Sequence, residues 1–154
     1  MMITVKRSKK SSLRSSPKKQ SFSDGSKNLF AYGIVALFAS LVGTYLDLIF
    51  VGKGMYHFPA RLFPEIFTIN IVFTLVILPL FTILFLLVVK KIQPFPRFIM
   101  ILFISTVIFF IEQFTEHLGW FKHHTEWNHA YSLLGYMLFL FVVWKLFIFL
   151  SKKS

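Results

Sequence analysis

Four long apolar segments dominate this chain and leave little sequence for anything else. They cover residues 29–51, 66–89, 98–111 (extending toward Leu118) and 130–150. Each approaches or exceeds the ~20 residues that an α-helix needs to cross the hydrocarbon core of a bilayer. Hydrophobic residues make up 56% of the chain and charged residues 15%, whereas roughly a quarter of a soluble domain is charged. The chain is therefore predicted to be an integral membrane protein.

The apolar segments are continuous, which favours helices over a β-barrel, because membrane strands are short and alternate in polarity. We expect an all-α polytopic protein, in which residues 29–151 form an antiparallel bundle of four transmembrane helices. Glycines predict two helix ends, with Gly52 and Gly54 after the first segment and Gly119 after the third.

Prolines predict further features of the second and third helices. Pro79 lies within the second apolar segment and is expected to kink it, as membrane helices tolerate. Pro94 and Pro96 fall in a short connection, residues 90–97. A connection of this length predicts that the second and third helices are antiparallel neighbours.

Basic residues alternate along the chain and predict its orientation. Residues 1–28 contain eight Lys and Arg against one acid, Asp24. They are too polar to form a core, so a disordered tail is expected. The connection 90–97 and the C-terminal tail are also basic, whereas loop 119–129 carries only Lys122. The positive-inside rule therefore places both termini in the cytoplasm.

The basic tail also predicts a partner. Each Lys or Arg near an anionic lipid surface contributes ~1 kcal/mol of attraction, so we expect residues 1–28 to bind anionic lipid. The tail lacks the interleaved aromatic residues of a nucleic-acid arm, and no nucleic-acid partner is predicted.

Polar side chains concentrate toward the outer ends of the predicted helices. On the first helix a stripe of small residues, Gly33, Ala36, Ser40 and Gly43, leads to Asp47. Small residues allow membrane helices to approach closely. The other helices place polar residues at a similar depth, which predicts an outward-facing polar pocket. Its candidate residues are Asp47, Arg61, Asn70, Glu112, Glu116, His129 and Ser132.

The stretch 112–129 holds three of the six acidic residues and four of the five histidines. Histidine and carboxylate are ligands for zinc, iron or manganese. Glu126 and His129 also form one Glu-x-x-His motif, of which di-iron bundles carry two. Because only one is present, we predict no cofactor and expect a solvated loop. The residues of that expected loop are His117, His123, His124 and Glu126. A further interpretation is that these histidines titrate near neutral pH and make the loop a pH sensor.

The loop after the first apolar segment is rich in proline and aromatic residues. Phe58-Pro59 and Phe63-Pro64 repeat five residues apart. Proline favours extended backbone in the residue before it, so Phe58 and Phe63 are expected to be extended in a stiff turn on the membrane surface. Arg61 lies between them and is a candidate lid that reaches a carboxylate, since guanidinium binds carboxylate bidentately. The candidate carboxylates for this contact with Arg61 are Asp47, Glu65 and Glu112.

Residues 45–82, YLDLIFVGKGMYHFPARLFPEIFTINIVFTLVILPLFT, and residues 127–132, WNHAYS, resemble a known group of sequences. The group is an uncharacterised family of small four-helix membrane proteins, found mainly in Bacillus-like, Gram-positive, spore-forming bacteria. The resemblance covers most of the chain beyond residue 40, and Phe-Pro-x-Arg-x-Phe-Pro is its most specific part. It implies a plasma-membrane location and supplies no activity, cofactor or catalytic residue.

These features predict a membrane component that binds rather than catalyses: an accessory or sensing protein, associated with lipid, a partner membrane protein or a second copy of itself. The first alternative is a membrane-embedded metal-dependent enzyme, which needs histidines that converge on Glu112. Its candidate residues are Glu112, Glu116, Glu126 and His129. The second alternative is a small ion or solute transporter. It is disfavoured because the inner half of the predicted bundle has no acid or histidine.

Overall fold

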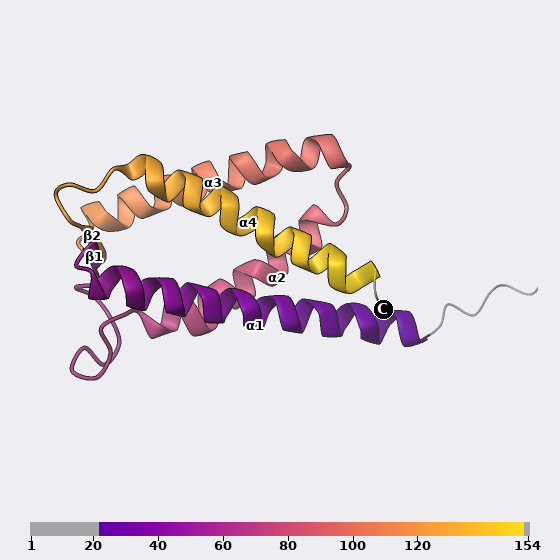
Figure 1. The fold of residues 1–154 in the computed structure, drawn as a ribbon, viewed down its shortest axis with the longest axis horizontal. Coiled ribbons are helices and arrows are strands. Elements are labelled where there is room, and N and C mark those ends of the chain that lie inside the picture. The colour runs from indigo at the N-terminus through magenta and orange to yellow at the C-terminus, as the bar shows by residue number, and fades with distance from the viewer. Residues whose placement is uncertain (1–21, 153–154) are drawn as a thin grey trace, which may run out of the picture.

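The structure is a computed structural model that describes residues 22–152 (Figure 1). Its helices are α1 (Phe22–Gly52), α2 (Leu78–Val89), α3 (Pro94–His117) and α4 (His129–Lys152). A π-helix, η1 (Phe73–Ile77), leads directly into α2. Two short strands, β1 (Tyr56–His57) and β2 (Lys122–His123), form an antiparallel pair. The prediction of an all-α fold is confirmed, with this strand pair as the only sheet among the described residues.

Three helical segments have the length and composition of membrane spans: Asn28–Gly52, Pro94–His117 and His129–Ser151. The remaining apolar helix, Phe73–Val89, is shorter. The predicted second apolar segment covers residues 66–89, but residues 66–70 lie before the helix, in turns, bends and irregular backbone.

Two helix starts differ from the predictions. The helix α1 begins at Phe22, inside the segment 1–28 that we expected to be disordered, while residues 1–21 lie outside the described chain. The helix α3 begins at Pro94, so Pro94 and Pro96 lie in its first turn rather than in a loop. Proline suits a first turn because the backbone N–H groups there have no intrahelical acceptor.

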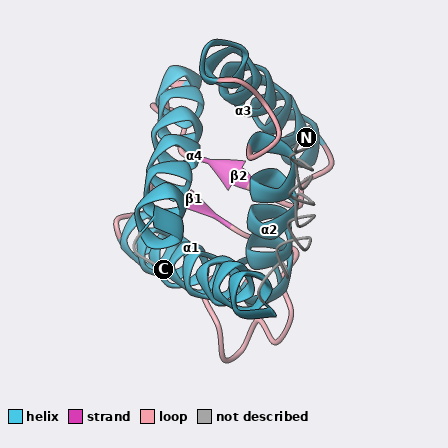
Figure 2. Cartoon of the chain, turned by 90° about the vertical axis from the view of Figure 1, so that its right-hand side faces the viewer, coloured by secondary structure: helices cyan, strands magenta, loops and turns pink. Residues whose placement is uncertain are grey.

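The start of α1 and the end of α4 lie at one end of the bundle, and β1 and β2 lie at the other (Figure 1). We call these the terminal end and the loop end. Figure 2 views the bundle from the terminal end, with both strands behind the helices. The main helix contacts join α1 to α2, α3 to α4 and α1 to α4. The second and third helices run in opposite directions, as predicted (Figure 1), but α2 and α3 are not a main contact pair despite their short connection.

The hydrophobic core lies toward the terminal end and draws on all four helices. Its members come from the first half of α1, the end of α2, the start of α3 and the second half of α4. They are Ala31, Val35, Ala39, Phe85, Leu86, Val89, Ile101, Leu140, Val143 and Phe147.

The contact between α1 and the η1–α2 segment uses part of the predicted small-residue stripe. The Ser40 hydroxyl donates to the carbonyl of Thr74 at 2.8 Å. A Cβ added to Gly43 would lie 2.3 Å from Cδ2 of Leu78, so glycine allows this close approach. Gly33, at the other end of the stripe, is exposed and takes no part in it.

The π-helix η1 lies directly before Pro79, where we predicted a kink. The N–H of Leu78 donates to the carbonyl of Phe73, five residues earlier. Proline has no N–H and its ring clashes with the preceding turn, so a wider turn relieves the crowding.

At the terminal end, Arg97 of α3 connects three helices. Its Nε donates to the carbonyl of Val89 at 3.2 Å, and its Nη2 to the carbonyl of Ile92 at 2.5 Å. The guanidinium lies 4.9 Å from the ring centre of Trp144 on α4. Val89 is the last residue of α2 and Ile92 lies just after it, and carbonyls at a helix C-terminus lack intrahelical donors.

We expect Arg97→Ala to lower the free energy of unfolding in detergent by about 2 kcal/mol, because it removes two charged hydrogen bonds and a cation–π contact. Arg97→Lys should recover only part of this loss, since lysine lacks the planar fork. Lys91→Ala, at an exposed neighbouring position, is the control and should change stability by no more than about 0.5 kcal/mol. Thermal unfolding monitored by circular dichroism gives the comparison, and equal stability of the Arg97→Ala and Lys91→Ala proteins would refute this role.

Candidate functional site at the loop end

Two helices end at the loop end in the same way. At the end of α1, Gly54 has φ +68° and Met55 N–H donates to the carbonyl of Phe50. At the end of α3, Gly119 has φ +75° and Trp120 N–H donates to the carbonyl of Thr115. Both are Schellman motifs, which place glycine in the left-handed region. The predictions for Gly54 and Gly119 are confirmed, while Gly52 is the last residue of α1 itself.

Each Schellman turn leads into one strand, and the two strands pair. Tyr56 lies opposite His123, and His57 lies opposite Lys122. The amide of His124 extends the pairing by donating to the carbonyl of Met55 at 2.8 Å. The pairing fixes the loop between α3 and α4 against the loop after α1.

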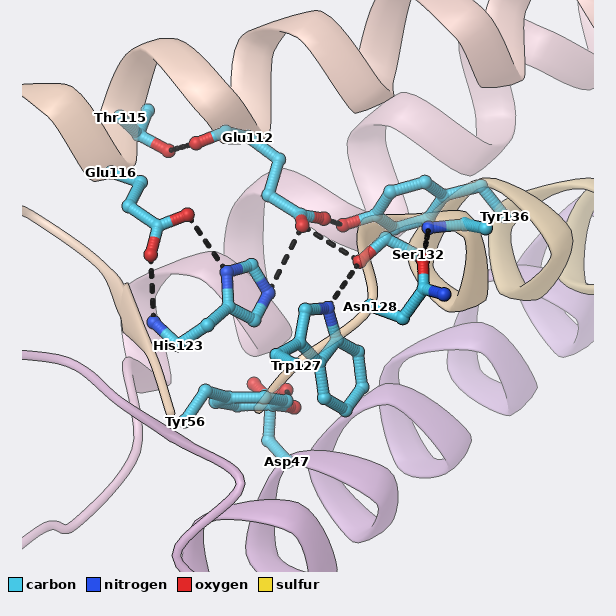
Figure 3. Close-up of polar contacts among 11 residues, drawn as sticks. Asp47, Tyr56, Glu112, Thr115, Glu116, His123, Trp127, Asn128, Ser132 and Tyr136 are labelled. Carbon is cyan, nitrogen blue, oxygen red and sulfur yellow. Dashed lines mark hydrogen bonds and ion pairs between the residues drawn. The ribbon is translucent and has the colours of Figure 1, made fainter. Parts of the chain in front are cut away.

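The strand β2 carries His123 into a position between two carboxylates of α3 (Figure 3). Its Nδ1 lies 2.8 Å from Oε2 of Glu116, and its Nε2 lies 3.1 Å from Oε1 of Glu112. The His123 backbone N–H also donates to Oε1 of Glu116 at 2.9 Å. Burial lowers the pKa of His123, but hydrogen bonds to the two glutamates and their charges outweigh it, so the pKa is raised above its ordinary value. Both ring nitrogens face carboxylates, so the ring in its protonated form donates to each of them and links the two glutamates.

The Glu112 side chain is only 7% exposed, and it accepts hydrogen bonds from α4 as well. The Ser132 hydroxyl donates to Oε1 at 2.7 Å, and the Tyr136 hydroxyl donates to Oε2. Trp127 Nε1 in turn donates to the Ser132 oxygen at 3.2 Å. A buried carboxylate is stable when it is paired and hydrogen-bonded, and Glu112 meets both conditions.

A second pair of residues ties β1 to α1. The Tyr56 hydroxyl donates to Oδ1 of Asp47 at 2.5 Å. Burial, followed by the negative charge of Asp47, raises the pKa of Tyr56, so the phenol keeps its proton and acts as a donor. The other oxygen, Oδ2 of Asp47, is buried and has no hydrogen-bond partner among the described residues.

Aromatic rings enclose the polar network. Trp127 stacks on His123 with 5.0 Å between ring centres and 14° between planes, and Tyr56 meets both rings edge-on. Phe121 packs against Tyr56 and His123 at 5.0 and 4.5 Å. A surface groove of about 530 Å³ runs along the outer side of Trp127, between the turn after α1 and the loop before α4. The network is thus packed and lies behind Trp127, instead of lining an open pocket.

The structure brings together part of the predicted pocket. Glu112, Glu116 and Ser132 join one network, and a ring nitrogen of His129 lies near Glu112. Asp47 connects to this group only through the ring contacts of Tyr56. Asn70 lies elsewhere, where its side-chain oxygen accepts from the amide of Phe73 at 3.3 Å.

Arg61 stays within its own loop. Its guanidinium donates to the carbonyls of Phe58, Pro64 and Phe67 at 2.6, 3.1 and 2.6 Å, and it forms no ion pair in the described part of the chain. The extended geometry expected for Phe63 is wrong, since its φ is +53°. The carbonyl of Phe63 accepts the amides of Ile66 and Phe67, and this turn holds the residue in the left-handed region.

The predicted pocket did not include four members of the network, although helical spacing places Tyr136 on the face of Ser132: Tyr56, His123, Trp127 and Tyr136. We had placed His123 in a solvated loop, but its side chain is only 3% exposed. The other members of that expected loop, His117, His124 and Glu126, are exposed. The available signal was the position of Tyr136 one helical turn after Ser132, since residues at i and i+4 share a face.

The converging histidines that a metal-dependent chemistry requires are present. Glu112, His123 and His129 each offer one ligand atom, and these atoms all lie within 4.8 Å of one another. Glu126, the acid of the Glu-x-x-His motif, is exposed and is not part of this group. Comparison with models of protein families, with curated protein sequences and with solved structures finds no match for the chain.

We expect His123→Ala to destabilise the protein by about 3 kcal/mol, because it leaves two neighbouring carboxylates without their shared cation. The matched control is His124→Ala, since the adjacent His124 side chain is exposed and accepts a hydrogen bond from the amide of Glu126. Thermal unfolding in detergent measures the loss. Hydrogen exchange of the backbone amides of residues 122–124 should accelerate in the His123→Ala protein only. Equal effects of the two substitutions would show that His123 does not hold the loop.

Proposed function

We propose that this protein is a non-catalytic binding and sensing component of the bacterial plasma membrane, the location that the resemblance of residues 45–82 implies. In this proposal four helices cross the bilayer, including the shorter segment Phe73–Val89. Both termini lie in the cytoplasm and the loop end faces outward. The basic residues of the terminal end, such as Lys90, Lys91 and Arg97, support this orientation through the positive-inside rule.

The observation that carries the sensing role is the position of His123. A residue of a surface loop lies between two carboxylates of α3, and its strand is paired with the loop after α1. A ligand that changes this contact would move both strands, and with them the ends of α1 and α3. Such coupling between a site and two packed helices is what a two-state sensor requires.

Two further observations favour binding over the alternatives. Ser132 donates to Glu112 and accepts from Trp127, while Glu112 also accepts from Tyr136 and faces His123, so these side chains join α3, α4 and the loop between them as a binding surface requires. Away from the loop end, the buried polar side chains of the described residues carry only hydroxyl groups, which gives a charged solute no relay across the bundle. These side chains are Ser40, Thr74, Thr82 and Ser105.

Under this proposal the partners are the bilayer itself, with anionic lipid at basic residues 1–28, and a membrane protein or second copy of the chain. Apolar side chains that remain exposed along α1, α3 and α4 are suited to lipid or to another membrane helix.

The orientation is testable because the chain contains no cysteine. Lys122→Cys at the loop end should react with a membrane-impermeant maleimide on intact cells. Lys91→Cys at the terminal end should react only after permeabilisation. Both lysines are exposed, so the reagent reaches either side chain wherever the compartment permits. The opposite labelling pattern would reverse the proposed topology.

The sensing role predicts that loss of the His123 contact reproduces loss of the protein. A strain that carries His123→Ala should show the transcriptional response of a deletion strain, whereas His124→Ala should match the wild type. Immunoblots of membrane fractions must show equal protein levels. A His123→Ala strain that behaves as wild type, when the deletion strain does not, would contradict the proposal.

A further inference from the structure

We propose that Glu112, His123 and His129 bind a divalent first-row transition metal ion, with zinc as the first candidate. One carboxylate oxygen and one ring nitrogen of each histidine lie within 4.8 Å of one another. The residues belong to α3, β2 and the first position of α4, so only the folded loop end assembles them. The proposal names the ligand of the sensing site, and its biological meaning rests on that proposed function.

The distance between two of the ligands suits a shared ion. Nε2 of His123 lies 3.1 Å from Oε1 of Glu112. Two ligands of tetrahedral zinc with bonds of about 2.0–2.1 Å are about 3.3 Å apart. The pair would therefore need very little movement to bind one ion. The same distance fits a hydrogen bond, so an ion competes with a proton for this position and releases that proton to solvent when it binds.

Neighbouring groups orient these two ligands. Histidines that bind metal commonly donate their second ring N–H to a carboxylate, which fixes the tautomer. Nδ1 of His123 lies 2.8 Å from Oε2 of Glu116, which leaves Nε2 directed at Glu112. The hydroxyls of Ser132 and Tyr136 hold the Glu112 carboxylate in place. These neighbouring groups hold both ligands in fixed positions, as the residues around a metal site commonly do.

His129 supplies an independent observation. Its Nδ1 is buried and has no hydrogen-bond partner within residues 22–152, although buried polar atoms nearly always find one. Its ring meets His123 edge-on with 5.1 Å between ring centres, and it packs against Phe109 at 6.5 Å. An ion would give His129 the partner that ring packing does not provide.

The donor set indicates the class of ion. Two histidines and one carboxylate are typical of three-ligand zinc sites and of iron(II) sites, whereas calcium and magnesium prefer oxygen ligands. The positive charge of the ion would also offset the carboxylates of Glu112 and Glu116 in a setting that screens charge poorly.

The test uses full-length protein purified in mild detergent without a metal-affinity tag, and zinc as the probe. Isothermal titration should give one zinc per chain for the wild type. His129→Ala should weaken zinc affinity at least ~100-fold, beyond the ~10–100-fold loss expected for Glu116→Gln, whose carboxylate only orients His123. Controls are His124→Ala and Glu126→Gln, which change exposed side chains outside the group and should retain wild-type affinity.

His129→Ala is the decisive variant because no hydrogen bond joins the ring to Glu112 among the described residues, so the Glu112 network should stay intact and unfolding should change less than in the His123→Ala protein. Cobalt(II) provides a second readout, since its visible absorption reports coordination directly and should disappear in this variant. A wild type that binds neither zinc nor iron(II), or a His129→Ala protein that binds zinc as tightly as wild type, would overturn the metal site.

The two proposals fail in different experiments. A protein that binds zinc but shows reversed cysteine labelling, or no effect of His123→Ala in cells, would contradict the sensing function alone. A protein that binds no metal but keeps the labelling pattern and the His123 dependence would contradict the metal site alone.

Discussion

The carboxylate of Glu112 is the constraint on which the loop end depends. It lies on α3 about one turn before the helix ends, in a chain with few other acidic residues, and is 7% exposed. Burial of an ionised carboxylate is strongly unfavourable unless it gains a counter-charge and hydrogen bonds. Ser132 and Tyr136 supply hydrogen bonds from α4, and His123 supplies the charge from the intervening loop. The carboxylate therefore joins α3, α4 and their connection into one unit.

His123 can reach Glu112 because its loop is held from both sides. Gly119 ends α3 with a sharp turn, and Glu116 then binds both the backbone N–H and the ring of His123. On the other side β1 pairs with β2, and Tyr56 connects β1 to Asp47 on α1. At the loop end, residues of the two loops thus connect carboxylates that lie on different helices. A change at this surface would act on α1 and α3 together.

The rest of the bundle depends on packing and on its terminal end. Close approach of α1 to the η1–α2 segment uses Gly43 and the hydroxyl of Ser40, which donates to the Thr74 carbonyl beside the π-helix. Arg97 donates to carbonyls at and just after the C-terminal end of α2 while its guanidinium lies over the ring of Trp144 on α4. The protein thus combines an apolar core toward the terminal end with a polar network at the loop end.

The sequence by itself determined the apolar helices and the glycine turns at Gly54 and Gly119, because hydropathy and backbone sterics act locally. Helical spacing also indicated that Glu112 and Ser132 lie at similar depth. Local rules gave the wrong geometry for Phe63, because acceptor contacts within its turn outweigh the preference before proline. Only the tertiary structure decided that His123 is buried, since its ring nitrogens find partners on α3 and its strand pairs with β1, far away in the sequence. Composition cannot distinguish a solvated loop histidine from one that links two carboxylates, because the difference lies in which distant groups the fold brings beside it.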